Sequence, residues 1–196
     1  MRNVPRVPPF DRPATYDDLV KLPDHLVAEI VNGELHASPR PAPRHAVAGA
    51  AIGGLLVPPY FHGRGGPGGW WVLYEPELHL GPDVLVPDWA GWRRERMATP
   101  PVDLPYFPLP PDWVCEILSP STASLDRARK LAIYARERVP HAWLIDPIAR
   151  TLEVLALAED HYSILAVHAG SESVRAAPFV EVAIDLAALW IEPPAP

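Results

Sequence analysis

The sequence predicts a mixed α/β (α+β) fold, in which a mixed β-sheet is flanked by a few helices. The chain has 196 residues, of which 48% are hydrophobic and 21% charged, enough for one buried core. Short apolar runs of strand length alternate with two stretches whose apolar residues recur at helical spacing. Many of the 27 prolines fall in three stretches, residues 1–13, 39–43 and 100–111, which we interpret as extended segments between elements.

The N-terminal third begins with local signals. We interpret residues 1–14 as a proline-rich tail and residues 15–192 as a single domain. Thr15 and Asp18 have the spacing of a capping box, which predicts a short helix that stops at Pro23. The pair Asn32-Gly33 is the strongest short hairpin signal, and it predicts paired strands at residues 26–31 and 34–38.

The remaining elements follow from apolar spacing. Residues 46–57 predict a helix that Pro58-Pro59 ends, and a glycine-rich loop follows at residues 63–69. That loop lacks the Lys-Ser or Lys-Thr ending of a phosphate-binding P-loop. A second helix is predicted at residues 124–138. Strands are predicted at residues 70–74, 77–80, 84–90, 113–118, 141–146, 151–157 and 161–167.

The segment from Arg93 to Pro111 is long for a loop in a small domain. Loops of this length often act as lids or binding loops, and a passive surface excursion is the alternative.

Charge and cysteine content restrict the function classes. The net charge of −7 argues against unspecific nucleic-acid binding. The arginines nevertheless cluster, so that Arg93, Arg94, Arg127 and Arg129 form either solvated faces or a local basic rim around an acidic site. The single cysteine, Cys115, excludes an internal disulfide framework. No apolar stretch approaches the ~20 residues that cross a bilayer, and residues 1–13 have no signal-peptide h-region, so we expect a soluble cytoplasmic protein without membrane contact.

Two carboxylates in apolar runs are the most informative feature. Asp88 lies in the predicted strand 84–90 and Glu116 in the predicted strand 113–118. A buried charge costs several kcal/mol unless it is paired or bound to a cation, so the two acids indicate a metal site. A strand cap combined with a structural ion pair is the alternative. Asp126, Lys130 and Tyr134, spaced four apart, add a cation and a phenol on one helical face.

The motifs together resemble the Uma-two family of candidate endonucleases, in the PD-(D/E)XK, restriction-endonuclease-like superfamily. The resemblance covers roughly residues 15–190. It is carried by Val-Pro-Asp at 86–88, Cys-Glu-Ile-Leu-Ser-Pro-Ser-Thr at 115–122, Asp126, Lys130, Tyr134, Ala-Trp-Leu-Ile-Asp-Pro at 142–147, and Ala-Glu-Ile-Val-Asn-Gly-Glu-Leu at 28–35 followed by His45.

The resemblance implies a restriction-endonuclease-like mixed sheet and a Mg²⁺ (or Mn²⁺) ion. Asp88, Glu116 and the backbone carbonyl of Ile117 would hold that ion, which would activate water and neutralise charge on the transition state. In the superfamily the catalytic lysine stands two residues after the glutamate, on the same sheet face. Here that position is Leu118, and the resemblance implies that Lys130 on the following helix replaces it, stabilising the oxyanion or orienting the water.

The other candidate residues have more than one interpretation. Glu29 either contacts the metal through water, orders the site, or is an exposed cross-strand partner. His45 either contacts a phosphate, orients Glu29, or is structural. Asp126 and Tyr134 either hold Lys130 in place or form surface helix pairs.

The resulting hypothesis is a metal-dependent DNA endonuclease, a hydrolase of phosphodiester bonds. The alternative is a non-catalytic nucleic-acid- or protein-binding member of the same fold. DNA is the expected partner, and a homodimer would let two sites address two strands. The scattered histidines and single cysteine do not fit a zinc site. Paired acids of the glycosidase kind stay open, whereas Ser119-Pro120-Ser121 lacks the glycines of a nucleophile elbow.

Overall fold

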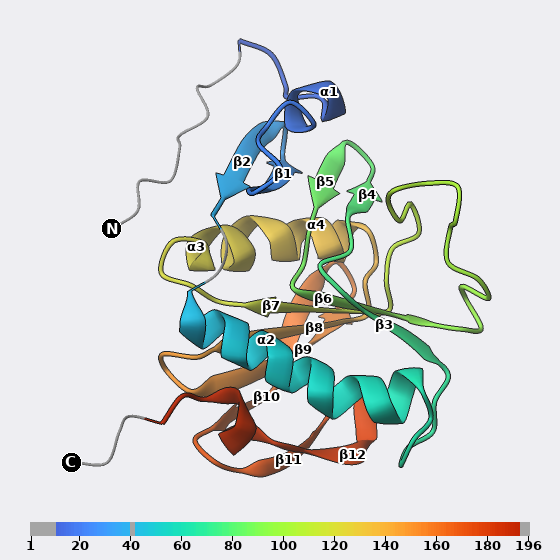
Figure 1. The fold of residues 1–196 in the computed structure, drawn as a ribbon, viewed down its shortest axis with the longest axis vertical. Coiled ribbons are helices and arrows are strands. Elements are labelled where there is room, and N and C mark those ends of the chain that lie inside the picture. The colour runs from blue at the N-terminus through green and yellow to red at the C-terminus, as the bar shows by residue number, and fades with distance from the viewer. Residues whose placement is uncertain (1–10, 40–41, 193–196) are drawn as a thin grey trace.

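The computed structural model describes residues 11–39 and 42–192, in which two β-sheets lie one above the other (Figure 1). Residues 1–10 of the predicted tail lie outside the described residues. The six-stranded sheet has the order β10 (His161–Ala169), β9 (Thr151–Ala158), β8 (His141–Asp146), β7 (Trp113–Ile117), β6 (Trp89–Arg93), β3 (Trp70–Tyr74). The four-stranded sheet has the order β2 (Glu34–Ser38), β1 (Val27–Val31), β5 (Asp83–Leu85), β4 (Leu78–Leu80). Because β7 and β8 are parallel while β6 and β7 are antiparallel, the larger sheet is mixed, and the predicted fold class is confirmed.

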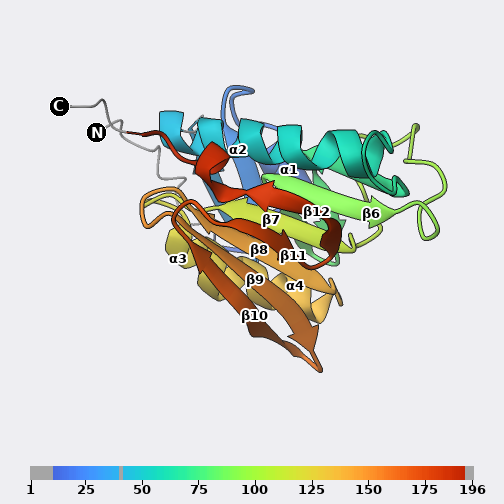
Figure 2. The same cartoon turned by 90° about the horizontal axis from the view of Figure 1, so that it is seen from below.

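The larger sheet has a layer on each face (Figure 2). One face packs against α2 (Pro43–Leu56) and the hairpin of β11 (Ser173–Ala176) and β12 (Phe179–Asp185). The other packs against a helical run of α3 (Ala123–Leu125), a π-helical turn (Asp126–Lys130) and α4 (Leu131–Arg136).

Alternation along β7 decides which layer each side chain meets. Trp113, Cys115 and Ile117 belong to the core on the α2 side. Val114 and Leu118 belong to the core that contains α4. Because side chains alternate along a strand, Glu116 faces the helical run that carries Lys130.

The predicted hairpin at Asn32-Gly33 is confirmed. Both residues have positive φ angles, 52° and 77°, as the mirror-image turn of a two-residue hairpin requires. The N–H of Ala14 donates to the carbonyl of Gly33, so the last residue of the predicted tail packs on this turn. The capping bond from Thr15 to Asp18 opens α1 (Tyr16–Leu19), which ends four residues before Pro23.

The predicted strand 84–90 was wrong, because it is two strands in two sheets. The chain leaves the four-stranded sheet after Leu85 and enters the six-stranded sheet at Trp89. Pro87 lies at the crossing, where its missing N–H interrupts no ladder. The change of sheet places Asp88 at a corner, where the single predicted strand would have placed it in the middle of a ladder.

The predictions of the two longer helices needed correction. Pro58 and Pro59 do not end the first helix, which begins earlier, at Pro43, and continues through a π-helical turn at Val57–Phe61. The second helix ends at Arg136 and contains the π-helical turn Asp126–Lys130. Such turns are rare and are frequently found at functional sites. Within the described residues, no helix is both long and apolar enough to cross a bilayer.

Sequence patterns also missed the end of the fold. Strands β11 and β12 and the 3₁₀-helix Leu186–Leu189 were not predicted, although Phe179 and Leu186 are fully buried. Strand β11 has only four residues, and the buried positions of β12, Phe179 and Ile184, are five residues apart, so no period of two marks it in the sequence. The long loop is held by a bridge between Leu78 and Phe107, whose ring stacks on Trp92 at 4.7 Å.

The packing of α2 on the sheet depends on Gly53. A Cβ at this position would lie 2.5 Å from the ring of Trp89, whose indole N–H donates to the carbonyl of Gly49. We expect Gly53→Ala to lower the free energy of unfolding by about 1–3 kcal/mol, because the added methyl overpacks the contact. Urea denaturation measures this. Gly54→Ala is the matched control, since nothing lies within 4 Å of its Cβ, and it should be neutral or slightly stabilising. Equal unfolding midpoints for the two variants would contradict the expected overpacking.

Candidate active site

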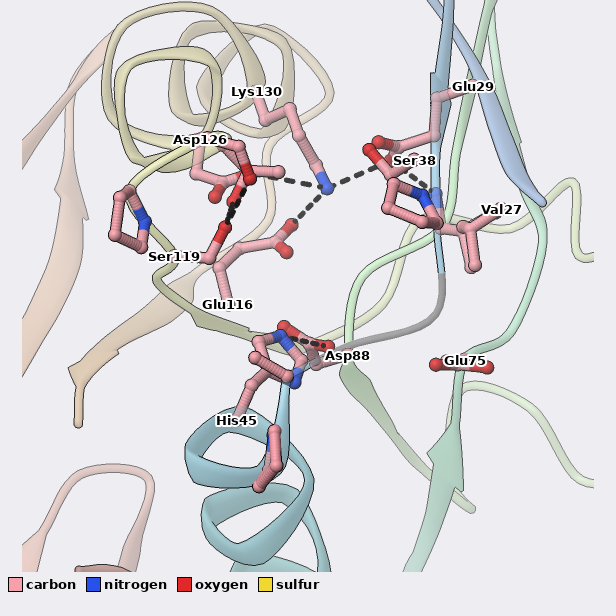
Figure 3. A pocket seen from close by; sticks show the side chains of 17 residues that line it. Val27, Glu29, Ser38, His45, Glu75, Asp88, Glu116, Ser119, Asp126 and Lys130 are labelled. Atoms are coloured by element: carbon pink, nitrogen blue, oxygen red, sulfur yellow. Dashed lines mark hydrogen bonds and ion pairs between the residues drawn. The ribbon is translucent and has the colours of Figure 1, made fainter. Parts of the chain in front are cut away.

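A cavity of about 520 Å³ lies where the two sheets meet the start of α2 and the π-helical turn (Figure 3). Five side chains were predicted from the sequence to act in catalysis, and all of them line this cavity: Glu29, His45, Asp88, Glu116 and Lys130. Its titratable lining residues are Glu29, His45, Glu75, Asp88, Glu116, Asp126 and Lys130. The structure therefore brings together residues that are up to 101 positions apart along the chain.

Lys130 is the centre of the cluster. Its Nζ lies 2.8 Å from Glu29 Oε1, 2.9 Å from Glu116 Oε1 and 3.6 Å from Asp126 Oδ1, and the residue is only 2% exposed. Burial disfavours the ammonium, but the carboxylates around it, Glu116 foremost, outweigh burial and raise the pKa of Lys130 well above its ordinary value. In the metal-free protein the side chain is thus a cation and hydrogen-bond donor at neutral pH.

Glu116 is held from two sides. The hydroxyl of Tyr134, in α4, donates to Glu116 Oε1 at 2.6 Å, and Lys130 approaches the same oxygen. Burial, together with the charges of Asp126 and other nearby acids, raises the pKa of Glu116 well above its ordinary value, although Lys130 opposes the shift. The prediction that Tyr134 holds Lys130 needs correction, because its hydroxyl binds Glu116.

Asp88 is fixed by two donors at the corner between the sheets. Its Oδ2 accepts the backbone N–H of Ile117 at 2.6 Å, and its Oδ1 lies 3.1 Å from His45 Nε2. Burial lowers the pKa of His45, but the hydrogen bond and charge of Asp88 outweigh it, so the pKa is raised. His45 lies in the first turn of α2, which begins at Pro43, a residue suited to that position. The partner of His45 is therefore Asp88, and not Glu29 as one sequence interpretation had it.

Glu29 joins the smaller sheet to the cluster. Its Oε1 accepts the backbone N–H of Val86 and contacts Lys130, both at 2.8 Å. The residue is 8% exposed, so the alternative of an exposed cross-strand partner was wrong, although His36 does lie opposite it on β2.

Acidic groups outnumber basic groups in this cavity, with five carboxylates against Lys130 and His45. Oxygen ligands of this kind are those that Mg²⁺ and Mn²⁺ prefer. A divalent cation would offset the excess negative charge, so the donor set fits such an ion. Within residues 11–39 and 42–192, however, no three His, Cys, Asp or Glu side chains are already grouped as metal ligands. Lys130 lies between Glu29 and Glu116 instead.

Comparison with known protein families assigns this chain to one of them. The sequence profile of the Uma2 family, described as "Putative restriction endonuclease", matches residues 13–188. The chain belongs to the Uma2 family. The Uma2 match confirms the resemblance drawn from the motifs.

A solved structure supports the same fold. It is described as a putative nuclease belonging to DUF820 from Anabaena variabilis. It superimposes with a TM-score of 0.68 at 22% identity, over 90% of this Uma2 chain and 97% of the other. None of the curated proteins compared with this chain matches it.

The predicted arginine rim does not form as a unit in this Uma2 protein. Arg94 lies 4.0 Å from the ring centre of Trp71 and donates to the carbonyl of Phe61. Arg127 pairs with Glu153, and only Arg129 reaches a cavity next to the site. Arg93 lies 4.6 Å from the ring centre of Trp70. The segment from Arg93 to Pro111 contributes no side chain to the lining of the active-site cavity, so its predicted role as a lid has no support.

Sequence reasoning missed several lining residues. Glu75 follows β3 with a φ of 44°, and its N–H donates to the carbonyl of Asp88. A carboxylate at a strand end before a proline is the signal that could have identified it. The hydroxyls of Ser119, Ser121 and Thr122 also line the cavity. They lie in the loop directly after Glu116, a position that could have indicated them.

Proposed function

We propose that this protein is a divalent-metal-dependent endonuclease that hydrolyses phosphodiester bonds in DNA. The observation that carries the proposal is a buried ammonium, Lys130, held against Glu116 in a cavity that also contains Asp88 and an excess of carboxylates. The family description supports the same activity.

Each side chain has a distinct role in this proposal. Asp88, Glu116 and the carbonyl of Ile117 would hold Mg²⁺ or Mn²⁺. When bound, the ion would polarise the phosphate and lower the pKa of a water molecule. Lys130 donates hydrogen bonds to the oxygen on which negative charge develops, or orients the attacking water.

The remaining contacts are those of positioning residues. Tyr134 fixes one oxygen of Glu116, His45 fixes one oxygen of Asp88, and Glu29 and Asp126 keep Lys130 charged. A site whose groups are held before substrate arrives needs little reorganisation during the reaction.

A second candidate is a non-catalytic nucleic-acid- or protein-binding member of the fold. Leu118 favours it, because a buried leucine occupies the sheet position two residues after Glu116. The proposed nuclease does not need a lysine there, since the cation comes from the helical run on the same face of the sheet.

Cleavage of supercoiled plasmid separates the two candidates. We expect nicking or linearisation with Mg²⁺ or Mn²⁺, none with EDTA, and none with Glu116→Gln purified in parallel. Glu153→Gln, which removes an acid outside the cavity, should cleave like the wild type. Duplex binding in Ca²⁺ without cleavage in Mg²⁺ or Mn²⁺ would favour the binding protein. Concerted cutting of both strands is expected of a homodimer, in which two sites address two strands, and analytical ultracentrifugation measures that state.

A further inference from the structure

A second cavity, of about 430 Å³, lies beside the active-site cavity. The two share Ser38, Ser121 and Thr122 as lining residues. The second cavity is lined by His36, Ala37, Ser38, Ser121, Thr122, Ser124, Leu125, Ala128 and Arg129. None of these residues is acidic, whereas five carboxylates line the first cavity. The second cavity thus has one fixed cation, Arg129, and no carboxylate among its lining residues, and it shares three hydroxyl-bearing residues with the first cavity.

An anionic oxygen already lies between two of these residues. Glu34 Oε2 is 2.5 Å from Arg129 Nη1 and 3.6 Å from His36 Nε2. The second distance is too long for a hydrogen bond, and His36 Nε2 is buried with no hydrogen-bond partner among the described residues. Glu34 itself is not part of the cavity lining, and its side chain is 62% exposed.

Arg129 can exchange its ion pair with Glu34 for an ion pair with another anion. Arg129 is 44% exposed, and ion pairs between exposed side chains contribute little to stability. A guanidinium binds phosphate through two parallel hydrogen bonds, and hydroxyl groups donate to the remaining oxygens. Glu34 therefore shows that the guanidinium of Arg129 takes an anionic partner, and a phosphate in the cavity could replace Glu34 as that partner.

We propose that the second cavity binds a backbone phosphate of the substrate strand, adjacent to the phosphate cleaved in the first cavity, and that Glu34 competes with this phosphate for Arg129 in the free protein. This inference rests on the proposed function. It explains how a chain with a net charge of −7 would hold nucleic acid beside a carboxylate-rich site. Arg129, His36 and the hydroxyls of the loop after β7 would make the contact.

Two substitutions with opposite expected effects test the proposal. Binding of a labelled DNA duplex is measured by fluorescence anisotropy in Ca²⁺ over a salt series. Arg129→Ala should lower affinity about tenfold and reduce the salt slope by about 0.9, the value for one lost phosphate contact. Glu34→Gln should raise affinity several-fold, because it removes the internal competitor.

The same ion-pair motif elsewhere on the helical run supplies matched controls. Arg127 pairs with Glu153 through two hydrogen bonds, and neither residue lines either cavity. Arg127→Ala and Glu153→Gln make the same charge changes and should alter affinity much less. In Mg²⁺, Arg129→Ala should raise KM with little change in kcat. Unfolding midpoints in urea establish that all four variants are folded.

The outcomes separate this inference from the proposed function. Cleavage by the wild type, together with equal affinities for Arg129→Ala and Arg127→Ala, would overturn the phosphate subsite and leave the nuclease intact. A Glu34→Gln affinity no higher than that of Glu153→Gln would also overturn it. If the wild type fails to bind any nucleic acid in Ca²⁺ at low salt, both the phosphate subsite and the proposed nuclease function are contradicted.

Discussion

Replacing Lys130 with methionine is expected to lower the rate of DNA cleavage by about two to three orders of magnitude, the range for loss of one donor to a developing charge. Stability should fall as well, by about 3–5 kcal/mol, because Glu29, Glu116 and Asp126 would lose their shared buried cation. Single-turnover cleavage in Mg²⁺ measures the rate, at a temperature where thermal unfolding shows the variant to be folded.

Two further variants separate charge from geometry. Lys130→Arg keeps the positive charge but not the compact ammonium, so it should fold better than the methionine variant and still cleave slowly. Lys21→Met removes an exposed lysine outside the cavity and should match the wild type. Full activity of Lys130→Met would refute the role given to this lysine, and another cation would have to be sought.

Asp88→Asn and Glu116→Gln are each expected to abolish measurable Mn²⁺ binding while the fold is kept. The carboxylates repel one another in the metal-free protein, so removing one charge should relieve that repulsion. Calorimetric titration of Mn²⁺ into each variant is the measurement, and Glu153→Gln is the control acid outside the cavity. Unchanged affinity in both variants would show that the ion, if bound, is held elsewhere.

The same titration should depend on pH. Burial and neighbouring acids raise the pKa of Glu116 above its ordinary value of 4.5, so protons compete with the metal. Mn²⁺ affinity should therefore increase as pH rises through the raised pKa, with release of protons into the buffer. A carboxyl whose pKa is raised by folding stabilises the fold when protonated and loses that contribution as pH rises. In EDTA, wild type should thus lose stability relative to Glu116→Gln as pH rises above the ordinary carboxyl pKa of 4.5.

Sequence reasoning predicted what depends on local signals. Asn32-Gly33 fixed the hairpin because a two-residue turn needs positive φ angles. The period of two along β7 placed Glu116 on one face, and the motif spacing indicated that Lys130 would meet it. Both inferences concern residues whose relation is set by one element or by the next one along the chain.

The predictions that were wrong concern contacts between distant segments of the chain. The chain changes sheets between Leu85 and Trp89 because β5 pairs with β1 and β4, whereas β6 pairs with β3 and β7. Hydrophobic periodicity along the sequence does not indicate which strands will pair. The arginine rim failed because Arg127 and Arg129 find acidic partners 26 and 95 positions away. The hydroxyl of Tyr134 shares the face of Lys130 but reaches across to β7. Pairing of this kind becomes visible only once the layers are packed.

The contact between Glu29 and Lys130 has a consequence for the life of the protein in the cell. It joins an early hairpin to a helix that is synthesised about a hundred residues later, so a nascent chain on the ribosome cannot assemble the cluster until most of the protein has been made. Contacts of such long sequence separation also require the most loop closure, and they form late in folding. The proposed cutting activity would therefore be absent from truncated copies that end before Lys130.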